Sequence, residues 1–245
     1  MDEPLPFELV ALRSAVNYQR WVADAAAPHL GARILEVGAG LGNLSRWLPL
    51  RERLVLSELE PELLRLLRAE ALERFGVDPR VTVVQADLGA ELPAAITAAD
   101  LDTIVSFNVL EHVADDVGVL ARLAALLQAS RCAGPRRIVS FVPAHQWAYG
   151  TIDAAYGHVR RYTAASFTAL AARSCPDWRL ETRYFNAFGL PGWVLLGRLL
   201  RRQSVSVTAI RSFERLCPWI RGIDDALHRL RFPFGQSLIA VLTHQ

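Results

Sequence analysis

The sequence contains no lysine, because each of its 27 basic residues is an arginine. Mechanisms that need a lysine, such as a Schiff base or a lysine general base, are therefore excluded. Cysteine is also scarce: Cys132, Cys175 and Cys217 are far apart and form no CxxC pair. This argues against a disulfide framework or a zinc site, so we predict no metal and expect idle thiols in a reducing compartment.

A strong net charge and a long hydrophobic run are absent too. The formal net charge is only +2, which argues against a nucleic-acid partner. The longest apolar stretch, residues 188–200, is interrupted by Pro191 and Arg198 and is too short to span a bilayer. The acidic N-terminus lacks the basic segment and apolar core of a signal peptide, so we expect a cytoplasmic protein.

Strand and helix patterns alternate along most of the chain. Apolar residues make up 52% of the 245 residues, enough for one α/β domain with an insertion. Helical spacing is found at residues 7–28, 61–75, 116–127 and 164–172. Short apolar runs predict strands at residues 34–37, 54–57, 81–85, 103–107, 137–142, 178–185 and 237–244. The alternation predicts a mostly parallel, doubly wound sheet.

A glycine-rich turn follows the first predicted strand. Gly38, Gly40 and Gly42 occupy alternate positions, and glycine adopts positive φ freely and lets a ligand approach the backbone. We expect a helix to follow, which would complete a nucleotide-binding corner. The G-x-G-x-G spacing differs from the G-x-G-x-x-G pyrophosphate fingerprint, so it disfavours a nicotinamide or flavin enzyme.

Acidic residues follow the next two predicted strands. Glu58 comes 20 residues after Gly38 and is placed to accept hydrogen bonds from two ribose hydroxyls. Asp87 could accept from an adenine amino group, with the backbone of Leu88 near a ring nitrogen. Taken alone, each acid could equally be a helix-cap or turn residue. Because the segment 108–112 also follows a strand, all these groups should meet at the carboxyl edge of the sheet.

Four motifs in order resemble those of the class I S-adenosylmethionine-dependent methyltransferases. They are LEVGAGLG at residues 35–42, SELEPEL at 57–63, QADL at 85–88 and DTIVSFNVLEHV at 102–113. The last is similar to the ubiquinone/menaquinone-type branch, where LEH is common. The resemblance covers about residues 30–145 and implies S-adenosylmethionine as cofactor and S-adenosylhomocysteine as product.

The resemblance also implies a fold and a set of cofactor contacts. The fold is a Rossmann-like, seven-stranded, mostly parallel sheet with a reversed last strand and a helical insertion before it. Glu36 matches a family position that orders the glycine loop. The cofactor-binding residues implied are Glu36, Gly38, Ala39, Gly40, Gly42, Glu58, Leu59, Asp87, Leu88 and Asn108.

We divide residues 1–245, a single domain, by these expectations. The parts are an N-terminal helix (1–30), a cofactor-binding core (31–145), a substrate side (146–185), a helical insertion (186–236) and the last strand (237–245). The insertion carries eight arginines among apolar residues. It could form a lid or pocket wall, a homodimer contact or a peripheral membrane surface.

The segment 143–162 is loop-like and concentrates polar and aromatic residues, which favours binding. We name His158 as the first candidate for a general base and His112 as the second, with a core histidine as the alternative for His112. Arg160 or Arg161 could hold a carboxylate or phosphate, or the two could cap helix ends or pair with Asp153 and Asp177. The substrate-side candidates are His145, Tyr149, Asp153, Arg160, Arg161 and Tyr162.

These residues predict a bacterial enzyme that transfers a methyl group from S-adenosylmethionine to a small molecule in a biosynthetic pathway. An oxygen acceptor is our first hypothesis, because two histidines could serve as a base for a hydroxyl. Methylation at nitrogen or carbon is the alternative within the same fold. An alternative of another class is a methyltransferase-fold cyclase or a non-catalytic binding partner.

Overall fold

The computed structural model describes residues 7–230 and 232–245. The acidic N-terminal residues, in which we expected no signal peptide, and Arg231 of the insertion lie outside them. One seven-stranded sheet has the order β3-β2-β1-β4-β5-β7-β6. Its strands are β1 (Arg33–Val37), β2 (Arg53–Glu58), β3 (Val81–Gln85), β4 (Thr103–Phe107), β5 (Arg136–Pro143), β6 (Arg179–Phe185) and β7 (Ser237–His244).

Strands β1 to β5 pair in parallel, whereas β7 is antiparallel to both β5 and β6. The predicted Rossmann-like sheet with a reversed last strand is therefore confirmed. In register, Val37 lies opposite Ser57 of β2 and Ser106 of β4. This alignment brings the ends of β1, β2 and β4 to one edge.

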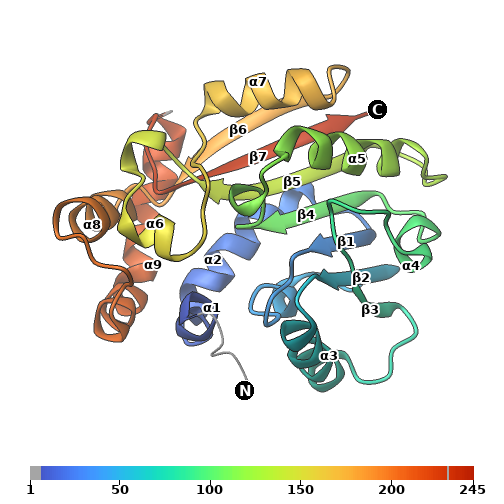
Figure 1. The fold of residues 1–245 in the computed structure, drawn as a ribbon, viewed down its shortest axis with the longest axis horizontal. Coiled ribbons are helices and arrows are strands. Elements are labelled where there is room, and N and C mark those ends of the chain that lie inside the picture. The colour runs from blue at the N-terminus through green and yellow to red at the C-terminus, as the bar shows by residue number, and fades with distance from the viewer. Residues whose placement is uncertain (1–6, 231) are drawn as a thin grey trace.

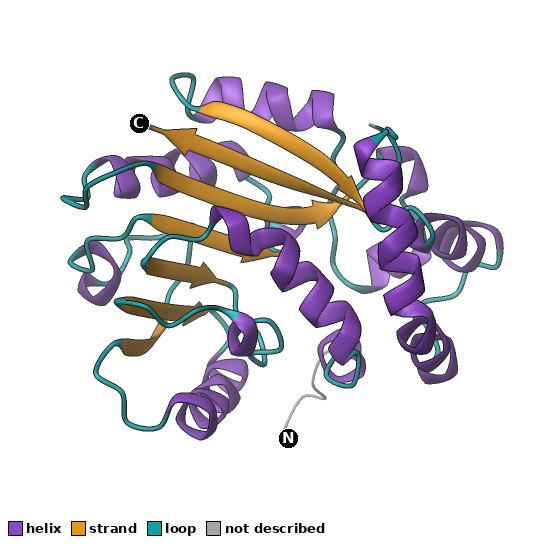
Figure 2. Ribbon diagram, turned by 180° about the vertical axis from the view of Figure 1, so that it is seen from behind, coloured by secondary structure: helices purple, strands orange, loops and turns teal. Residues whose placement is uncertain are grey.

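Helices cover both faces of the sheet, as the opposite views in Figures 1 and 2 show. Helices α5 and α7 pack on one face through Leu123 and Phe167, and α2, α3 and α9 pack on the other through Trp21, Leu67 and Cys217. The α-helices are α1 (Phe7–Leu12), α2 (Val16–Ala26), α3 (Pro61–Phe75), α4 (Ala94–Thr97), α5 (Asp116–Gln128), α6 (Thr151–Ala155), α7 (Ala164–Ser174), α8 (Gly189–Trp193) and α9 (Val207–Arg229).

The glycine turn is not followed by an α-helix, so that prediction was wrong. A short 3₁₀ turn, Ser45–Trp47, takes its place. Three glycines with φ between +58° and +77° fall within five residues, and these conformations prevent a helix from starting there. The Asn43 side chain instead donates to the Leu9 carbonyl at 2.8 Å, so α1 closes the corner.

Two further predictions differ in detail from the structure. The single N-terminal helix is divided into α1 and α2, and the side-chain amide of Gln19 stabilises the break by donating to the Leu12 carbonyl at 2.5 Å. The segment 143–162 is not all loop, because it contains α6. Figure 1 shows α6, α8 and α9 beyond the carboxyl ends of β4 and β5.

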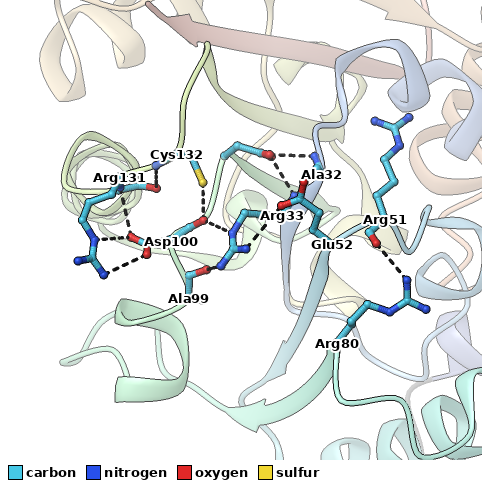
Figure 3. Close-up of polar contacts among 11 residues, drawn as sticks. Ala32, Arg33, Arg51, Glu52, Arg80, Ala99, Asp100, Arg131 and Cys132 are labelled. Carbon is cyan, nitrogen blue, oxygen red and sulfur yellow. Dashed lines mark hydrogen bonds and ion pairs between the residues drawn. The ribbon is translucent and has the colours of Figure 1, made fainter.

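The opposite edge of the sheet is held by polar contacts (Figure 3). The Arg33 guanidinium donates to the backbone carbonyls of Ala99 and Asp100 at 2.7 and 2.6 Å. The Asp100 carboxylate pairs with Arg131 across the turn before β5. These contacts tie β1, β4 and β5 together at their amino ends, far from the edge where the predicted site residues gather.

The predicted insertion between β6 and β7 is helical. It contains α8, a π-helical turn η5 (Val194–Leu199) and the long helix α9. Thr151 of α6 donates to the Gly197 carbonyl at 2.8 Å, so η5 is attached to the substrate side. Within residues 7–230 and 232–245, the structure contains no helix with the length and apolarity needed to cross a bilayer.

Candidate active site

A cavity of about 1110 Å³ lies at the carboxyl edge of the sheet. It extends from the glycine turn to α8 and α9. Of the predicted site residues, Glu36, Gly38, Ala39, Gly40, Glu58, Leu59, Asp87, Leu88, Asn108, His112, His158 and Arg161 line it. Gly42, His145, Tyr149, Asp153, Arg160 and Tyr162 are not among its lining residues.

Gly38 begins the turn after β1 and has φ +64°. A Cβ atom at this position would lie 2.7 Å from Cγ2 of Val109, in the loop after β4. Both the conformation and the space therefore require glycine. The resulting turn exposes backbone of Gly38 to Gly40 to the cavity.

Glu58 connects the ends of β1 and β2. Its Oε2 accepts from the Gly40 amide at 2.7 Å, and its Oε1 accepts from the amides of Leu59 and Glu60 at 2.7 and 3.1 Å. The residue is buried except where it meets the cavity. Because a carboxylate has about four acceptor sites, this side chain can order the turn and still accept from a ligand hydroxyl.

Glu36 is a buried carboxyl group at the same end of the cavity. Its Oε2 has no hydrogen-bond partner within the described part of the chain. Burial raises its pKa to about 8, the Glu58 charge acts in the same direction, and the Ser45 hydroxyl partly offsets both. Such an unpartnered oxygen is suited to accept from a cationic or hydroxyl group of a ligand.

Asp87, Leu88 and Asn108 complete the glycine-turn end of the cavity, and Asp87 is more exposed than Glu36 and Glu58. Asp87 uses Oδ1 to accept from the Gly89 amide at 2.7 Å, which closes a turn after β3. The Leu88 carbonyl accepts from the Arg122 guanidinium. Asn108 has φ +55°, and its amide donates to the Phe141 carbonyl at 2.8 Å, which turns the chain away from β4.

The other end of the cavity is organised around Asp153. Its Oδ1 meets Arg161 Nε at 2.7 Å and His158 Nδ1 at 2.9 Å, and its Oδ2 accepts from Trp193 Nε1 at 3.1 Å. The side chains of Asp153 and Arg161 are almost completely buried. Burial by itself would raise the pKa of Asp153, but the contacts with His158 and Arg161 hold it below its ordinary value.

Three possible metal ligands lie beside this network. Glu111, His112 and His158 each offer one ligand atom, and these atoms lie within 4.8 Å of one another. Both carboxylate oxygens of Glu111 lack a hydrogen-bond partner in the described residues, and His158 Nε2 lies 3.9 Å from Glu111 Oε1. Burial raises the pKa of Glu111 to about 8. Burial is also the main cause that lowers the pKa of His112 to about 4, and the charge of the nearby His158 acts in the same direction. The sequence predicted no metal, but the structure gathers groups that could hold one.

The remaining substrate-side candidates make structural contacts around the segment 143–162 and do not line the cavity. Tyr149 donates to the His158 carbonyl at 2.8 Å, and Tyr162 donates to the Leu110 carbonyl at 3.1 Å. Arg160 pairs with Asp116, and His145 stacks on Tyr184 with ring centroids 4.8 Å apart. These contacts fix the backbone that presents His158.

Sequence reasoning missed Trp193 and passed over Glu111. Trp193 lies in the insertion, and Cζ of the Arg161 guanidinium lies over its ring, 4.8 Å from the ring centroid. A tryptophan in an apolar helix carries no signal of this role. Glu111 stood within the LEH motif, but only the structure shows that its carboxylate is buried without a partner.

Comparisons with known proteins find similarity to methyltransferases. A family model described as "Methyltransferase domain" matches residues 35–130. The chain is 38% identical over 100 residues to a ubiquinone biosynthesis O-methyltransferase of Xanthomonas euvesicatoria, which is 40% of this chain and 39% of that protein. A protein of the same name from Xylella fastidiosa (strain 9a5c) is 38% identical over 103 residues, covering 41% and 39%. The chain thus spans about two fifths of the length of these curated relatives.

Solved structures share the fold. An S-adenosylmethionine-dependent methyltransferase from Mesorhizobium loti superimposes with a TM-score of 0.57 at 16% identity, over 95% of this chain and all of that one. The methyltransferase domain of bacterial CtHen1 gives a TM-score of 0.57 at 11% identity, over 94% and 100%. At these identities the likeness concerns the fold alone.

Proposed function

We propose that this chain, whose residues 35–130 match a methyltransferase family model, is a class I S-adenosylmethionine-dependent enzyme that transfers a methyl group to an oxygen of a small molecule. S-adenosylmethionine, the cofactor of this family, supplies an electrophilic methyl group on a sulfonium when bound. The observation that carries the proposal is one continuous cavity with the glycine turn and Glu58 at one end and His158 at the other.

The residues at the glycine-turn end fit this cofactor. Gly38 leaves room that a Cβ would fill, and Glu58 keeps acceptor capacity for ribose hydroxyls. The unpartnered oxygen of Glu36 can accept from the ammonium group of the methionine part. Asp87 and Leu88 follow β3 and line the cavity, and we assign the Asp87 carboxylate and the Leu88 backbone to the adenine edge.

The residues at the other end can position and activate an acceptor hydroxyl. Asp153 fixes Nδ1 of His158, so Nε2 is the nitrogen that can receive a proton. His158 Nε2 would take the proton as the oxygen attacks the methyl carbon in line with the departing sulfur. Alignment of these atoms and exclusion of water contribute most of the rate enhancement.

A metal ion is a second means of activation in the same place. It is favoured by the buried, unpartnered carboxylate of Glu111 beside His112 and His158. Calorimetry with Mn²⁺ and Zn²⁺ on the untreated and chelator-treated protein separates the two mechanisms. Binding that Glu111→Gln abolishes supports the metal, and full activity after chelation supports His158 alone.

The cofactor assignment is tested by calorimetry with S-adenosylmethionine. Glu58→Gln should weaken binding at least tenfold, because one acceptor oxygen is replaced by a donor. Glu62→Gln, an exposed acid of the same segment that pairs with Arg65, is the matched control and should leave the affinity unchanged. Equal affinity in both variants would remove Glu58 from the ribose site.

The acceptor class is tested by transfer of a labelled methyl group to a panel of phenols, aliphatic alcohols and amines. Transfer to hydroxyl compounds that falls in His158→Gln supports O-methylation. Transfer to amines that persists in that variant supports the nitrogen alternative, because a neutral amine needs no base. Cofactor binding without transfer to any class would favour a binding protein or a cyclase.

We place the enzyme in the cytoplasm of a bacterium. The three cysteines are free, and two of them are buried, which suits a reducing compartment. The matched relatives are bacterial proteins. The pathway in which the enzyme acts depends on the identity of the acceptor, and the methyl-transfer panel is the first step toward identifying that acceptor.

A further inference from the structure

Helix α9 presents apolar residues on two different faces. Its inner face packs against α2 and the sheet through buried Cys217, and Ile210 and Phe213 line the cavity. Its outer face carries Leu216, Trp219, Ile223 and Leu230, whose exposed fractions are 56%, 78%, 48% and 79%. The inner face is explained by the fold, whereas the outer face has no counterpart within the described residues.

The four outer residues form one stripe. They are spaced by three, four and seven positions, which places them within an arc of about 60° on an α-helix. Leu230 follows directly on the last helical residue and continues the stripe. Large apolar residues in a continuous exposed row mark a surface that contacts something other than water.

Arginines border this stripe on its outer side. Arg211, Arg215 and Arg229 are exposed, and none of them forms an ion pair with a carboxylate in the described part of the chain. Arg221 is different, because it pairs with Asp24 of α2 at 2.6 Å. The helix therefore separates its arginines: one holds the fold together, and three accompany the exposed apolar row.

We propose that the outer face of α9 docks on an anionic lipid bilayer. A helix with Trp and Leu on one face and Arg at the border of that face lies in the interface, with the rings among the headgroups and the guanidinium groups on phosphate. The charge pattern selects lipid over a second copy of this chain. An antiparallel two-fold pairing of the same face would bring the unpaired arginines of both copies together.

Docking in this orientation would also bring the cavity close to the bilayer surface. Val205, Ile210 and Phe213, just before and within the first turns of α9, line the cavity while the outer stripe contacts lipid. In η5, Leu196 lines the cavity, whereas Leu195 and Leu199 are exposed. If the proposed methyl transfer holds, on which this step rests, the acceptor is an amphipathic molecule whose apolar part reaches the cavity from the bilayer.

Flotation with vesicles tests the docking without any methyl acceptor. The full chain should float with phosphatidylcholine vesicles containing 30% phosphatidylglycerol (about this fraction gives a strongly anionic surface) and should stay at the bottom with phosphatidylcholine alone. Trp219→Ser with Leu216→Ser, and separately Arg211→Glu with Arg215→Glu, should each weaken binding roughly 100-fold or more. Leu72→Ser on α3, which is 58% exposed, is the matched control and should bind like the parent.

Each outcome decides between lipid and the other occupants. No flotation, or flotation equal in all variants, overturns the proposal. A dimer by light scattering that Trp219→Ser with Leu216→Ser converts to monomer, without vesicle binding, assigns the stripe to a second copy. S-adenosylmethionine affinity is measured on every variant. Unchanged affinity with lost flotation separates a failed surface from a failed fold, and vesicle binding without cofactor binding would contradict the proposed function alone.

Discussion

The two ends of the cavity are built from different parts of the chain. At the glycine-turn end, most of the contacts are made by backbone: the amides of Gly40, Leu59 and Glu60 all donate to Glu58. At the other end, side chains contact side chains, and Asp153 joins His158, Arg161 and Trp193. Both ends nevertheless contain one buried carboxyl group with an unpartnered oxygen, Glu36 and Glu111.

This difference determines how each end responds to substitution. A backbone-built site depends on conformation, so it changes most where a new side chain distorts the chain. A side-chain network depends on each member, and the loss of one partner leaves a buried charge unpaired. We therefore expect the largest effects from steric substitutions at the first end and from isosteric ones at the second.

The largest effect is expected from Gly38→Ala. The added Cβ would approach Val109 within 2.7 Å, and the residue would keep a strained positive φ. Affinity for S-adenosylmethionine should fall by about 100-fold or more in calorimetry, because the clash and the backbone strain each cost about 1–3 kcal/mol. Gly76→Ala is the matched control, because Gly76 also has φ +64° but meets nothing within 4 Å. Equal affinity of Gly38→Ala and the parent would show that the turn is not the cofactor site.

Asp153→Asn should have the next largest effect and should act at the other end only. The shape is kept, but the charge that orders His158 and balances Arg161 is lost. Turnover should fall about 10- to 100-fold, as for other groups that orient a functional histidine. Cofactor affinity should stay within twofold of the parent. Trp193→Phe removes a single hydrogen bond to Asp153 and should give a smaller loss in the same assay. A change in cofactor affinity instead of turnover would mean that the two ends are not separate.

The two buried carboxyl groups can be compared by the pH dependence of stability. Their pKa values are raised from 4.5 to about 8, so the folded chain keeps protons that the unfolded chain releases. The stabilisation is complete below pH 4.5 and is lost as pH rises through 8. Urea unfolding should show a free energy of unfolding lower by a few kcal/mol at pH 8.5 than at pH 5.5. Glu36→Gln and Glu111→Gln should each reduce this difference. A difference that Glu111→Gln leaves unchanged would mean that this group is ionised and paired, for example with a metal ion.

Asp87→Ala should have the smallest effect. Asp87 is exposed, and one of its oxygens already accepts from Gly89, so water competes for the contact with an adenine edge. Affinity for S-adenosylmethionine should fall about fivefold, consistent with about 1 kcal/mol for an exposed hydrogen bond. Glu91→Ala, an exposed acid four residues further on, is the control. A loss as large as that of Gly38→Ala would place Asp87 in a far drier site than this geometry indicates.

The same difference between the ends explains what the sequence could predict. Strand ends, glycine spacing and the acids that follow strands are local features of the sequence. The sheet and its antiparallel last strand were therefore predicted, and the structure confirms them. The glycine-turn residues were also predicted to lie together, and most of them line one cavity. The helix after the turn was wrong, because three positive φ angles in five residues override the general strand–turn–helix pattern.

The other end depends on contacts between distant segments. Trp193 meets Asp153 across 40 positions, and Glu111 meets His158 across a gap that contains β5. No periodicity in the sequence relates these residues, so the polar segment could be identified as a candidate but its organisation could not. The alternative that the arginines are structural was partly right. Arg161 pairs with Asp153 as that alternative stated, and Arg160 pairs with a different acid, Asp116.

The position of β7 in the sheet has a consequence for the order of folding during synthesis. This strand, Ser237–His244, follows β6 only after α8, η5 and α9, yet it is the only sheet neighbour of β6 in the described structure. The nascent chain can assemble β1 to β5 as soon as they emerge, whereas β6 and the helices after it must wait for β7. The parallel strands around the glycine turn can thus be paired before β6, at the far edge of the sheet, gains its only described neighbour.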